Sequence, residues 1–103
     1  MPVAVSRTRG RFAPSPSGPL HFGSLVAALG SYLQAKSHGG EWLLRIEDID
    51  TSRVQPGAAD SILRTLAQFG LHWDQTETYQ TQRLARYQQI FAELKQQQLI
   101  YGC

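Results

Sequence analysis

Residues 11–24 combine residue types that could bind and activate a phosphate group. Pro14 and Pro16 fix the backbone φ angle and exclude helix, so this stretch should stay extended until the next helix begins. The free N–H groups at the start of a helix carry partial positive charge and favour an anion. His21, expected beside that helix start, could donate to a phosphate oxygen as negative charge builds in a transition state. These residues are therefore suited to phosphate chemistry.

The same stretch also has an ordinary interpretation. Pro, Gly and Ser are typical of surface loops, and a histidine near a helix start often serves as a cap. The sequence lacks the Gly-Lys-Ser/Thr of a P-loop and the G-x-G-x-x-G of a dinucleotide fingerprint. Spacing alone leaves both the phosphate site and the plain loop open.

Five elements are expected to position this stretch. Residues 9–13 predict a short strand, and apolar residues spaced three and four apart predict helices over 24–38, 59–69 and 82–98. The nearly continuous apolar run at 42–46 is typical of a strand covered on both faces. A strand, a helix and a second strand favour a parallel, right-handed crossover, so the expected fold class is α/β.

The expected sheet is small for a whole domain. Parallel sheets are normally wide and buried on both sides. A further strand is expected to begin at Ile100 and Tyr101, where the sequence ends. We therefore expect the chain to be the N-terminal part of something longer.

Composition excludes several classes of protein. The chain has 103 residues, 42% of them hydrophobic, which fits one small folded domain rather than a disordered segment. No apolar run approaches the roughly 18 residues that span a bilayer, and the N-terminus shows no secretory signal. The single cysteine, Cys103, suits a reducing cytoplasm, where we expect the protein to reside. A net charge of +2 is too small to argue for nucleic-acid binding.

Two motifs stand in order at residues 11–18 (Arg-Phe-Ala-Pro-Ser-Pro-Ser-Gly) and 21–24 (His-Phe-Gly-Ser). Together they resemble the first signature of the class I glutamyl-type aminoacyl-tRNA synthetases. The resemblance covers nearly the whole chain after Gly10. It continues at Leu44-Arg45-Ile46-Glu47-Asp48-Ile49-Asp50, Arg53, Pro56-Gly57-Ala58 and Gly70-Leu71-His72-Trp73-Asp74. It implies that residues 1–103 are the N-terminal half of one Rossmann-like, nucleotide-binding catalytic domain, with parallel strands and crossover helices.

The resemblance also implies catalytic and ATP-binding residues. His21 and Gly23 match the first His and the Gly of the family's His-x-Gly-His motif, and Ser24 stands where the second His would be. These three residues are the expected catalytic group. The expected ATP motif region comprises Pro14, Ser15, Pro16, Ser17, Gly18, Pro19, Leu20, His21, Phe22, Gly23 and Ser24.

A glutamate site is implied beside this motif. Arg11 is expected to bind the side-chain carboxylate of glutamate, because a guanidinium is always charged and can bind it through two hydrogen bonds. Glu47, at the end of the second strand, is expected to bind the α-ammonium group. The rest of the expected site comprises Phe12, Ala13, Pro14 and Ser15. Without the resemblance, Arg11 would be an exposed strand-end arginine and Glu47 one acid of a loop with Asp48 and Asp50.

The implied reaction joins L-glutamate to ATP, which brings Mg²⁺, and releases pyrophosphate. Ser17, Ile49 and residues 71–74 favour a shorter branch of the family, which lacks the anticodon-binding domain and attaches glutamate to the queuosine base of tRNA(Asp). The alternatives are part of an enzyme that charges tRNA(Glu), or a non-catalytic remnant that binds a nucleotide or tRNA. The sequence has no Lys-Met-Ser-Lys-Ser-like loop, so we expect these residues alone to be inactive. We expect a monomer.

Cys103 is implied to begin a metal site. In the shorter branch, Tyr101-Gly102-Cys103 aligns with the start of a zinc-binding segment, which makes Cys103 the first expected Zn²⁺ ligand. Structural zinc takes about four ligands, and the others are absent from this sequence. We expect zinc in a longer protein and not on these 103 residues.

The remaining candidates have structural interpretations. His38, before two glycines, is expected to cap the C-terminus of a helix. Trp42 and Trp73 are expected in the core. Asp50 and Arg53 are expected to form a local ion pair, with tRNA contact as the alternative.

Overall fold

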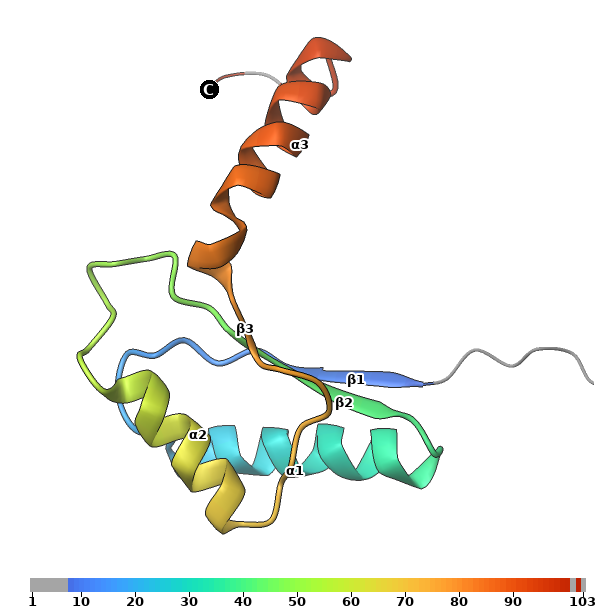
Figure 1. Ribbon diagram of the computed structural model, residues 1–103, viewed down its shortest axis with the longest axis vertical. Coiled ribbons are helices and arrows are strands. Elements are labelled where there is room, and N and C mark those ends of the chain that lie inside the picture. Colours follow the sequence, from blue (N-terminus) through green and yellow to red (C-terminus); the bar gives the residue numbers. More distant parts are fainter. Residues whose placement is uncertain (1–7, 101, 103) are drawn as a thin grey trace, which may run out of the picture.

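Two parallel strands joined by a helix form the centre of the molecule (Figure 1). The computed structural model describes residues 8–100 and 102. Strand β1 (Arg9–Phe12) pairs in parallel with β2 (Glu41–Ile46), and helix α1 (Phe22–Ser37) connects them. The α/β class and the parallel strand–helix–strand unit predicted from the sequence are confirmed.

Two glycines let these elements approach closely. A Cβ atom at Gly10 would lie 2.9 Å from the Cβ of Ala35 on α1, and one at Gly40 would collide with the backbone of Thr8. The N–H of Glu41 donates to the Thr8 carbonyl at 2.8 Å, so the two strands pair from their first residues. Glycine is therefore required at position 10 by the close approach of α1 and at position 40 by the backbone of Thr8.

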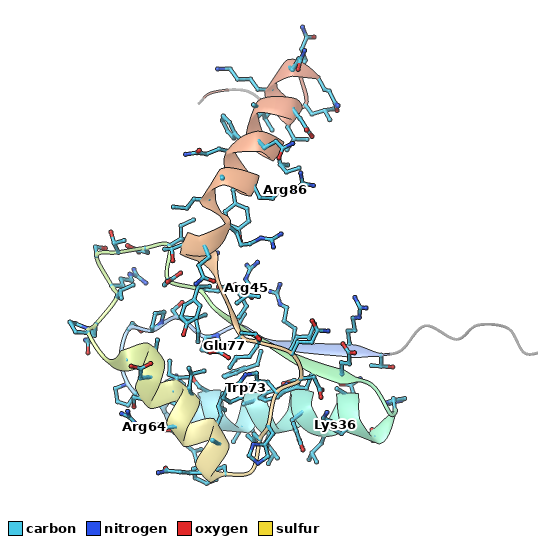
Figure 2. The ribbon with its side chains drawn as sticks, viewed as in Figure 1. Lys36, Arg45, Arg64, Trp73, Glu77 and Arg86 are labelled. Atoms are coloured by element: carbon cyan, nitrogen blue, oxygen red, sulfur yellow. The ribbon has the colours of Figure 1, made fainter. Side chains whose placement is uncertain are left out.

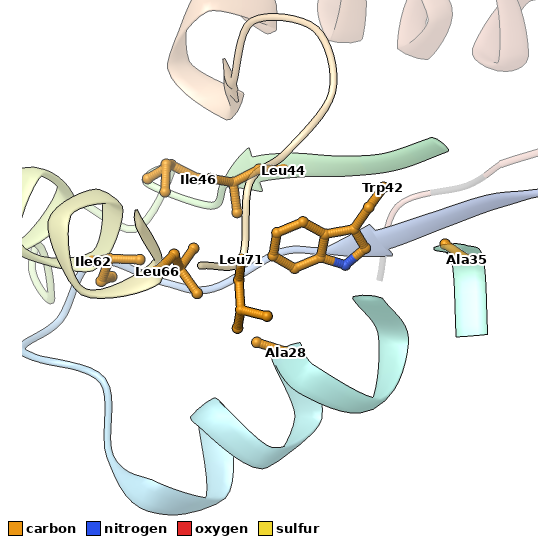
Figure 3. Packing of buried hydrophobic residues seen from close by; sticks show 8 residues of the cluster. All are labelled: Ala28, Ala35, Trp42, Leu44, Ile46, Ile62, Leu66 and Leu71. Atoms are coloured by element: carbon orange, nitrogen blue, oxygen red, sulfur yellow. The ribbon is translucent and has the colours of Figure 1, made fainter. Parts of the chain in front are cut away.

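The hydrophobic core lies between the sheet and two helices on one of its faces, α1 and α2 (Ala58–Gln68) (Figures 1 and 3). The buried cluster comprises Ala28 and Ala35 of α1, Trp42, Leu44 and Ile46 of β2, Ile62 and Leu66 of α2, and Leu71. Leu43 and Arg45 lie on the other face of β2 and are only half-buried. The sequence predicted a strand covered on both faces. In the described residues, the helices cover one face.

Trp42 sits at the centre of this core. Its ring stacks with Phe12 at a centroid distance of 6.2 Å and meets Tyr32 edge-on at 5.3 Å. Its indole Nε1–H donates to the Ser31 hydroxyl at 2.9 Å, so the polar atom is satisfied in the interior. The prediction that Trp42 is a core residue is confirmed. Trp73 is half-buried and packs against the same cluster.

Asp74 fastens the segment after α2 to the sheet. Its carboxylate accepts from the Trp42 N–H at 2.8 Å and from Lys36 Nζ at 2.6 Å. Its own N–H donates to the Trp42 carbonyl at 2.8 Å. The chain then runs along β2 to the short strand β3 (Thr78–Tyr79), which pairs in parallel with the end of β2 and gives the order β1-β2-β3. The sequence did not predict β3.

The chain beyond β3 leaves the core. A 3₁₀ turn, η1 (Gln80–Arg83), leads into α3 (Leu84–Gln96), which extends away from the sheet and has no buried residue (Figure 1). The predicted third helix is confirmed with slightly narrower bounds. Ile100 belongs to no strand, and Tyr101 lies outside the described residues. In the part of the chain that the structure describes, no helix is long and apolar enough to cross a membrane.

Candidate active site

The two groups of predicted site residues meet where β1 and β2 end. Parallel strands place their carboxyl ends at one edge of the sheet, where open α/β folds bind ligands. The N–H of Glu47 donates to the carbonyl of Pro14 at 2.9 Å, and the N–H of Gln55 donates to that of Pro16 at 3.0 Å. The turn after β1 and the acidic loop after β2 therefore lie side by side.

Two cavities border this turn. A cavity of about 100 Å³ is lined by Ser15, Ser17 and Glu47, among others. A second, of about 380 Å³, extends from the same two serines to His21 and Ser24 at the start of α1. Since Ser15 and Ser17 border both, the cavities adjoin. They offer one small space beside a carboxylate and one larger space beside a helix N-terminus.

His21 is the N-cap of α1. Its Nδ1 accepts from the backbone N–H of Ser24 at 3.2 Å, and its Nε2 lies 2.9 Å from the Ser24 hydroxyl. An accepting Nδ1 leaves the ring proton on Nε2, which then donates to that hydroxyl. A Cβ atom at Gly23 would lie 3.2 Å from the ring, so glycine leaves the ring room. His21 therefore caps α1, as an ordinary histidine would, and it also lies where the catalytic histidine was expected.

The start of α1 is suited to an anion. Its first turn contains no acidic residue, so the positive end of the helix dipole is not neutralised from within. His21 and Ser24 are exposed or half-exposed and line the larger cavity. A phosphate in that cavity would find the polar side chains of Ser15, Ser17, His21 and Ser24 along its wall.

Arg11 lies on the face of β1 that the helices leave open. Phe12, its neighbour, packs against Trp42, and strand alternation turns Arg11 the opposite way. Among the described residues Arg11 is exposed and has no hydrogen-bond or ion-pair partner. It borders neither cavity. The structure thus brings Glu47, the turn and His21 together, and leaves Arg11 close by along the strand.

Glu47 is held by a residue that the sequence analysis did not single out. Arg45 Nη2 lies 3.1 Å from Glu47 Oε1, and both side chains are 30% exposed. The two residues are two apart, which places them on one face of an extended chain. This two-residue spacing was the sequence signal from which the contact between Arg45 and Glu47 could have been predicted. Arg45 Nη1 also lies 3.4 Å from the hydroxyl of Tyr87 on α3, a contact that spacing could not reveal.

The rest of the acidic loop is tied to η1 or to itself. Asp48 accepts from the N–H of Thr81 at 3.0 Å and from its hydroxyl at 2.8 Å. Asp50 and Arg53 form the predicted local ion pair at 3.5 Å, and both are largely exposed. Asp48 is therefore a structural anchor of the loop, while Asp50 and Arg53 lie on the surface.

One other predicted residue, His38, lies away from this edge, and Tyr79, which the sequence analysis did not predict, lies beside it. His38 is the C-cap of α1, as predicted, and its Nδ1 lies 2.8 Å from the Gln34 carbonyl. Tyr79 of β3 stands beside the acidic loop, and burial together with Glu77 and other nearby carboxylates raises the pKa of its phenol above the usual 10.0. That phenol is therefore neutral at pH 7.

Metal ligands are not gathered in the described part of the chain. No group of three or more His, Cys, Asp or Glu side chains there could hold a metal ion. The predicted first zinc ligand, Cys103, lies outside the described residues.

Curated proteins provide close relatives. The chain is 63% identical over 95 residues to a protein of Dechloromonas aromatica named glutamyl-Q tRNA(Asp) synthetase, covering 92% of this chain and 32% of the relative. It is 62% identical over 101 residues to a protein of the same name from Cronobacter sakazakii, covering 98% and 34%. The chain therefore spans about a third of the length of the curated relatives it matches.

Solved structures support the same relationship. A glutamate tRNA ligase of Elizabethkingia meningosepticum, in complex with its amino acid, superposes with a TM-score of 0.85 at 37% identity, covering 88% of this chain and 20% of that one. A glutamate-tRNA synthetase of Elizabethkingia anophelis gives a TM-score of 0.83 over the same shares. The family model described as tRNA synthetases class I (E and Q), catalytic domain, matches residues 7–103. The chain belongs to this family of class I tRNA synthetases.

Proposed function

We propose that this chain supplies the nucleotide and amino-acid binding edge of an enzyme that activates L-glutamate with ATP and attaches it to the queuosine base of tRNA(Asp). The observation that carries the proposal is the junction of the turn after β1 with Glu47 at one sheet edge, through the bond between Glu47 N–H and the Pro14 carbonyl. The names of relatives above 60% identity support the choice of acceptor.

Glutamate would bind through two of its three charged groups. Arg11, unpaired among the described residues, would hold the side-chain carboxylate, and Glu47 would hold the α-ammonium group. Only Oε1 of Glu47 is engaged by Arg45, which leaves Oε2 for the ligand. The α-carboxylate would then point toward the larger cavity, where the phosphates of ATP would lie.

The first step is an in-line displacement at phosphorus. An oxygen of the glutamate α-carboxylate attacks the α-phosphorus of ATP, the bond from that phosphorus to the bridging oxygen breaks, and pyrophosphate leaves with the electron pair. The Nε2–H of His21, once released from the Ser24 hydroxyl, and the free N–H groups at the start of α1 would stabilise the negative charge on the phosphate oxygens. Mg²⁺ supplies further charge neutralisation when it arrives with ATP. These chain residues mainly bind and orient the reactants.

The second step transfers glutamate from the adenylate to tRNA. A hydroxyl group of the queuosine base attacks the activated carbonyl carbon and gives up its proton, the bond from that carbon to the phosphate oxygen breaks, and AMP leaves with the electron pair. Zinc belongs to this proposal only where further ligands join Cys103, because one thiolate does not make a structural site.

A second candidate acceptor is favoured by the solved structures, which are of a glutamate tRNA ligase and a glutamate-tRNA synthetase. In that case glutamate would be attached to the 3′ end of tRNA(Glu). Both candidates share the first step, so the choice between them depends on the acceptor.

The decisive experiment uses the complete gene product with labelled glutamate and ATP. We expect label on queuosine-containing tRNA(Asp), including tRNA whose 3′-terminal adenosine has been removed, and none on tRNA(Asp) that lacks queuosine. Label on tRNA(Glu) that disappears with its 3′-terminal adenosine would select the second candidate. Absence of glutamate-dependent ATP–pyrophosphate exchange would reject both and favour a binding remnant.

A further inference from the structure

We infer that Arg45 is a positioning residue for Glu47 and that Tyr87 of α3 holds Arg45 in place. The inference rests on the proposed function, in which Glu47 binds the α-ammonium of glutamate. It extends the site from the sheet edge to a helix that makes no part of the core.

The first argument is the direction of the Arg45 side chain. Trp42, Leu44 and Ile46 point into the core, so alternation turns Arg45 to the open face of β2, where Glu47 follows two residues later. Arg45 therefore does not support the core. Its guanidinium reaches along the strand to Glu47 Oε1 at 3.1 Å.

The second argument is burial. Both partners are 30% exposed, so their attraction is less screened than that of a surface pair such as Asp50 and Arg53, which are 59% and 80% exposed. One oxygen of Glu47 is fixed in this way, which sets the orientation of the other. A fixed carboxylate loses less entropy when it binds an ammonium group.

The third argument is what holds Arg45 itself. Nη1 lies 3.4 Å from the Tyr87 hydroxyl, and Nε is buried with no acceptor. Arg45 and Tyr87 also line a cavity of about 230 Å³ with Thr78 and Arg83 (the labelled Arg45 is seen beneath α3 in Figure 2). A buried donor without an acceptor is uncommon in proteins. With its two terminal nitrogens directed to Tyr87 of α3 and to Glu47 in the loop after β2, Arg45 is suited to linking these two parts of the chain.

Two simpler roles compete with this one. Arg45 could merely neutralise Glu47, or it could merely attach α3 to the sheet. Neutralisation alone would be satisfied by lysine, and attachment alone would affect stability without a selective effect on glutamate.

The test is a double-mutant cycle in the complete gene product, read by glutamate-dependent ATP–pyrophosphate exchange. We expect Arg45→Gln to raise KM for glutamate about tenfold and to leave KM for ATP unchanged. Glu47→Gln should lower kcat/KM for glutamate more, and adding Arg45→Gln to it should cause no further loss, because the residue through which Arg45 acts is already altered. Arg45→Lys should recover part of the loss only.

Tyr87→Phe keeps the ring and removes the hydroxyl. It therefore tests the contact between Tyr87 and Arg45 even if the Arg45 variants do not fold. It should raise KM for glutamate about threefold. Arg86→Gln, one residue away and bonded on the surface to Gln89, is the matched control and should change nothing.

The outcomes are distinct. Losses that multiply in the double variant, or a full recovery with Arg45→Lys, would overturn the inference and leave the proposed function standing. An unchanged KM for glutamate in Tyr87→Phe would overturn the role of α3. No exchange in the parent protein would overturn the proposed function and this inference with it.

Discussion

Two regions of this molecule differ in the interactions that hold them in place. The packed unit (residues 8–74) contains every buried side chain of the described core, while the arm (residues 80–96) contains none. The arm is attached by polar contacts, of Thr81 with Asp48 and of Tyr87 with Arg45. Both contacts end on residues that flank Glu47. We therefore expect changes in the packed unit to affect stability most, and changes where the arm joins the packed unit to affect the proposed glutamate site.

The largest loss of stability should result from a substitution that creates a cavity in the packed unit. Leu66 is fully buried between α2 and the sheet, so Leu66→Ala removes packed atoms and leaves a void. We expect the free energy of unfolding to fall by about 2–5 kcal/mol. Denaturant titration measures it, and a loss below about 1 kcal/mol would contradict the proposed core.

A smaller loss should follow removal of the Asp74 carboxylate. Asp74→Ala leaves the N–H of Trp42 and the ammonium of Lys36 without this acceptor, and should cost about 2 kcal/mol. Asp74→Asn keeps an acceptor for the backbone N–H and loses the negative charge that pairs with Lys36, so it should cost less than about 1 kcal/mol. Equal losses in the two variants would show that the ion pair, not the backbone bond, fastens this segment.

A change where the arm joins the site should alter binding more than stability. Thr81→Val removes the hydroxyl that donates to Asp48 at 2.8 Å and leaves the backbone bond in place. We expect KM for glutamate to rise about threefold because the loop beside Glu47 is less firmly held. Thr76→Val, an exposed threonine before β3, is the control. A rise of similar size in KM for glutamate in the control would contradict a specific role for the Thr81 hydroxyl.

The smallest effect should come from the arm's own surface. Leu84→Ala makes the same chemical change as Leu66→Ala at a side chain that is 42% exposed. The free energy of unfolding should change by less than about 0.5 kcal/mol. A loss comparable with that of Leu66→Ala would mean that the arm is packed as firmly as the core.

The same contrast explains how much of the fold the sequence predicts. The helices and the two longer strands are predictable because their apolar spacing is local. Strand β3 has two residues and no alternation, and its place depends on Asp74, which bonds to Trp42 across 32 positions. Helix α1 begins two residues before the expected Ser24 because His21 caps it.

The candidate site divides in the same way. The meeting of the turn after β1 with Glu47 follows from one rule, that parallel strands end at the same edge. The contacts from Thr81 and Tyr87 join residues more than thirty positions apart, so no local pattern reveals them. The contact of Arg45 with Glu47 could have been predicted, because two residues that are two apart on a strand lie on the same face.

The most direct test of the account compares two arginines of β1. Exchange kinetics of the complete gene product should show that Arg11→Ala raises KM for glutamate about 100-fold and leaves KM for ATP nearly unchanged, because a charged hydrogen bond to the carboxylate is lost. Arg9→Ala removes another exposed guanidinium two residues earlier and should leave both constants unchanged. Similar values for the two variants would contradict the assignment of the glutamate site to the end of β1.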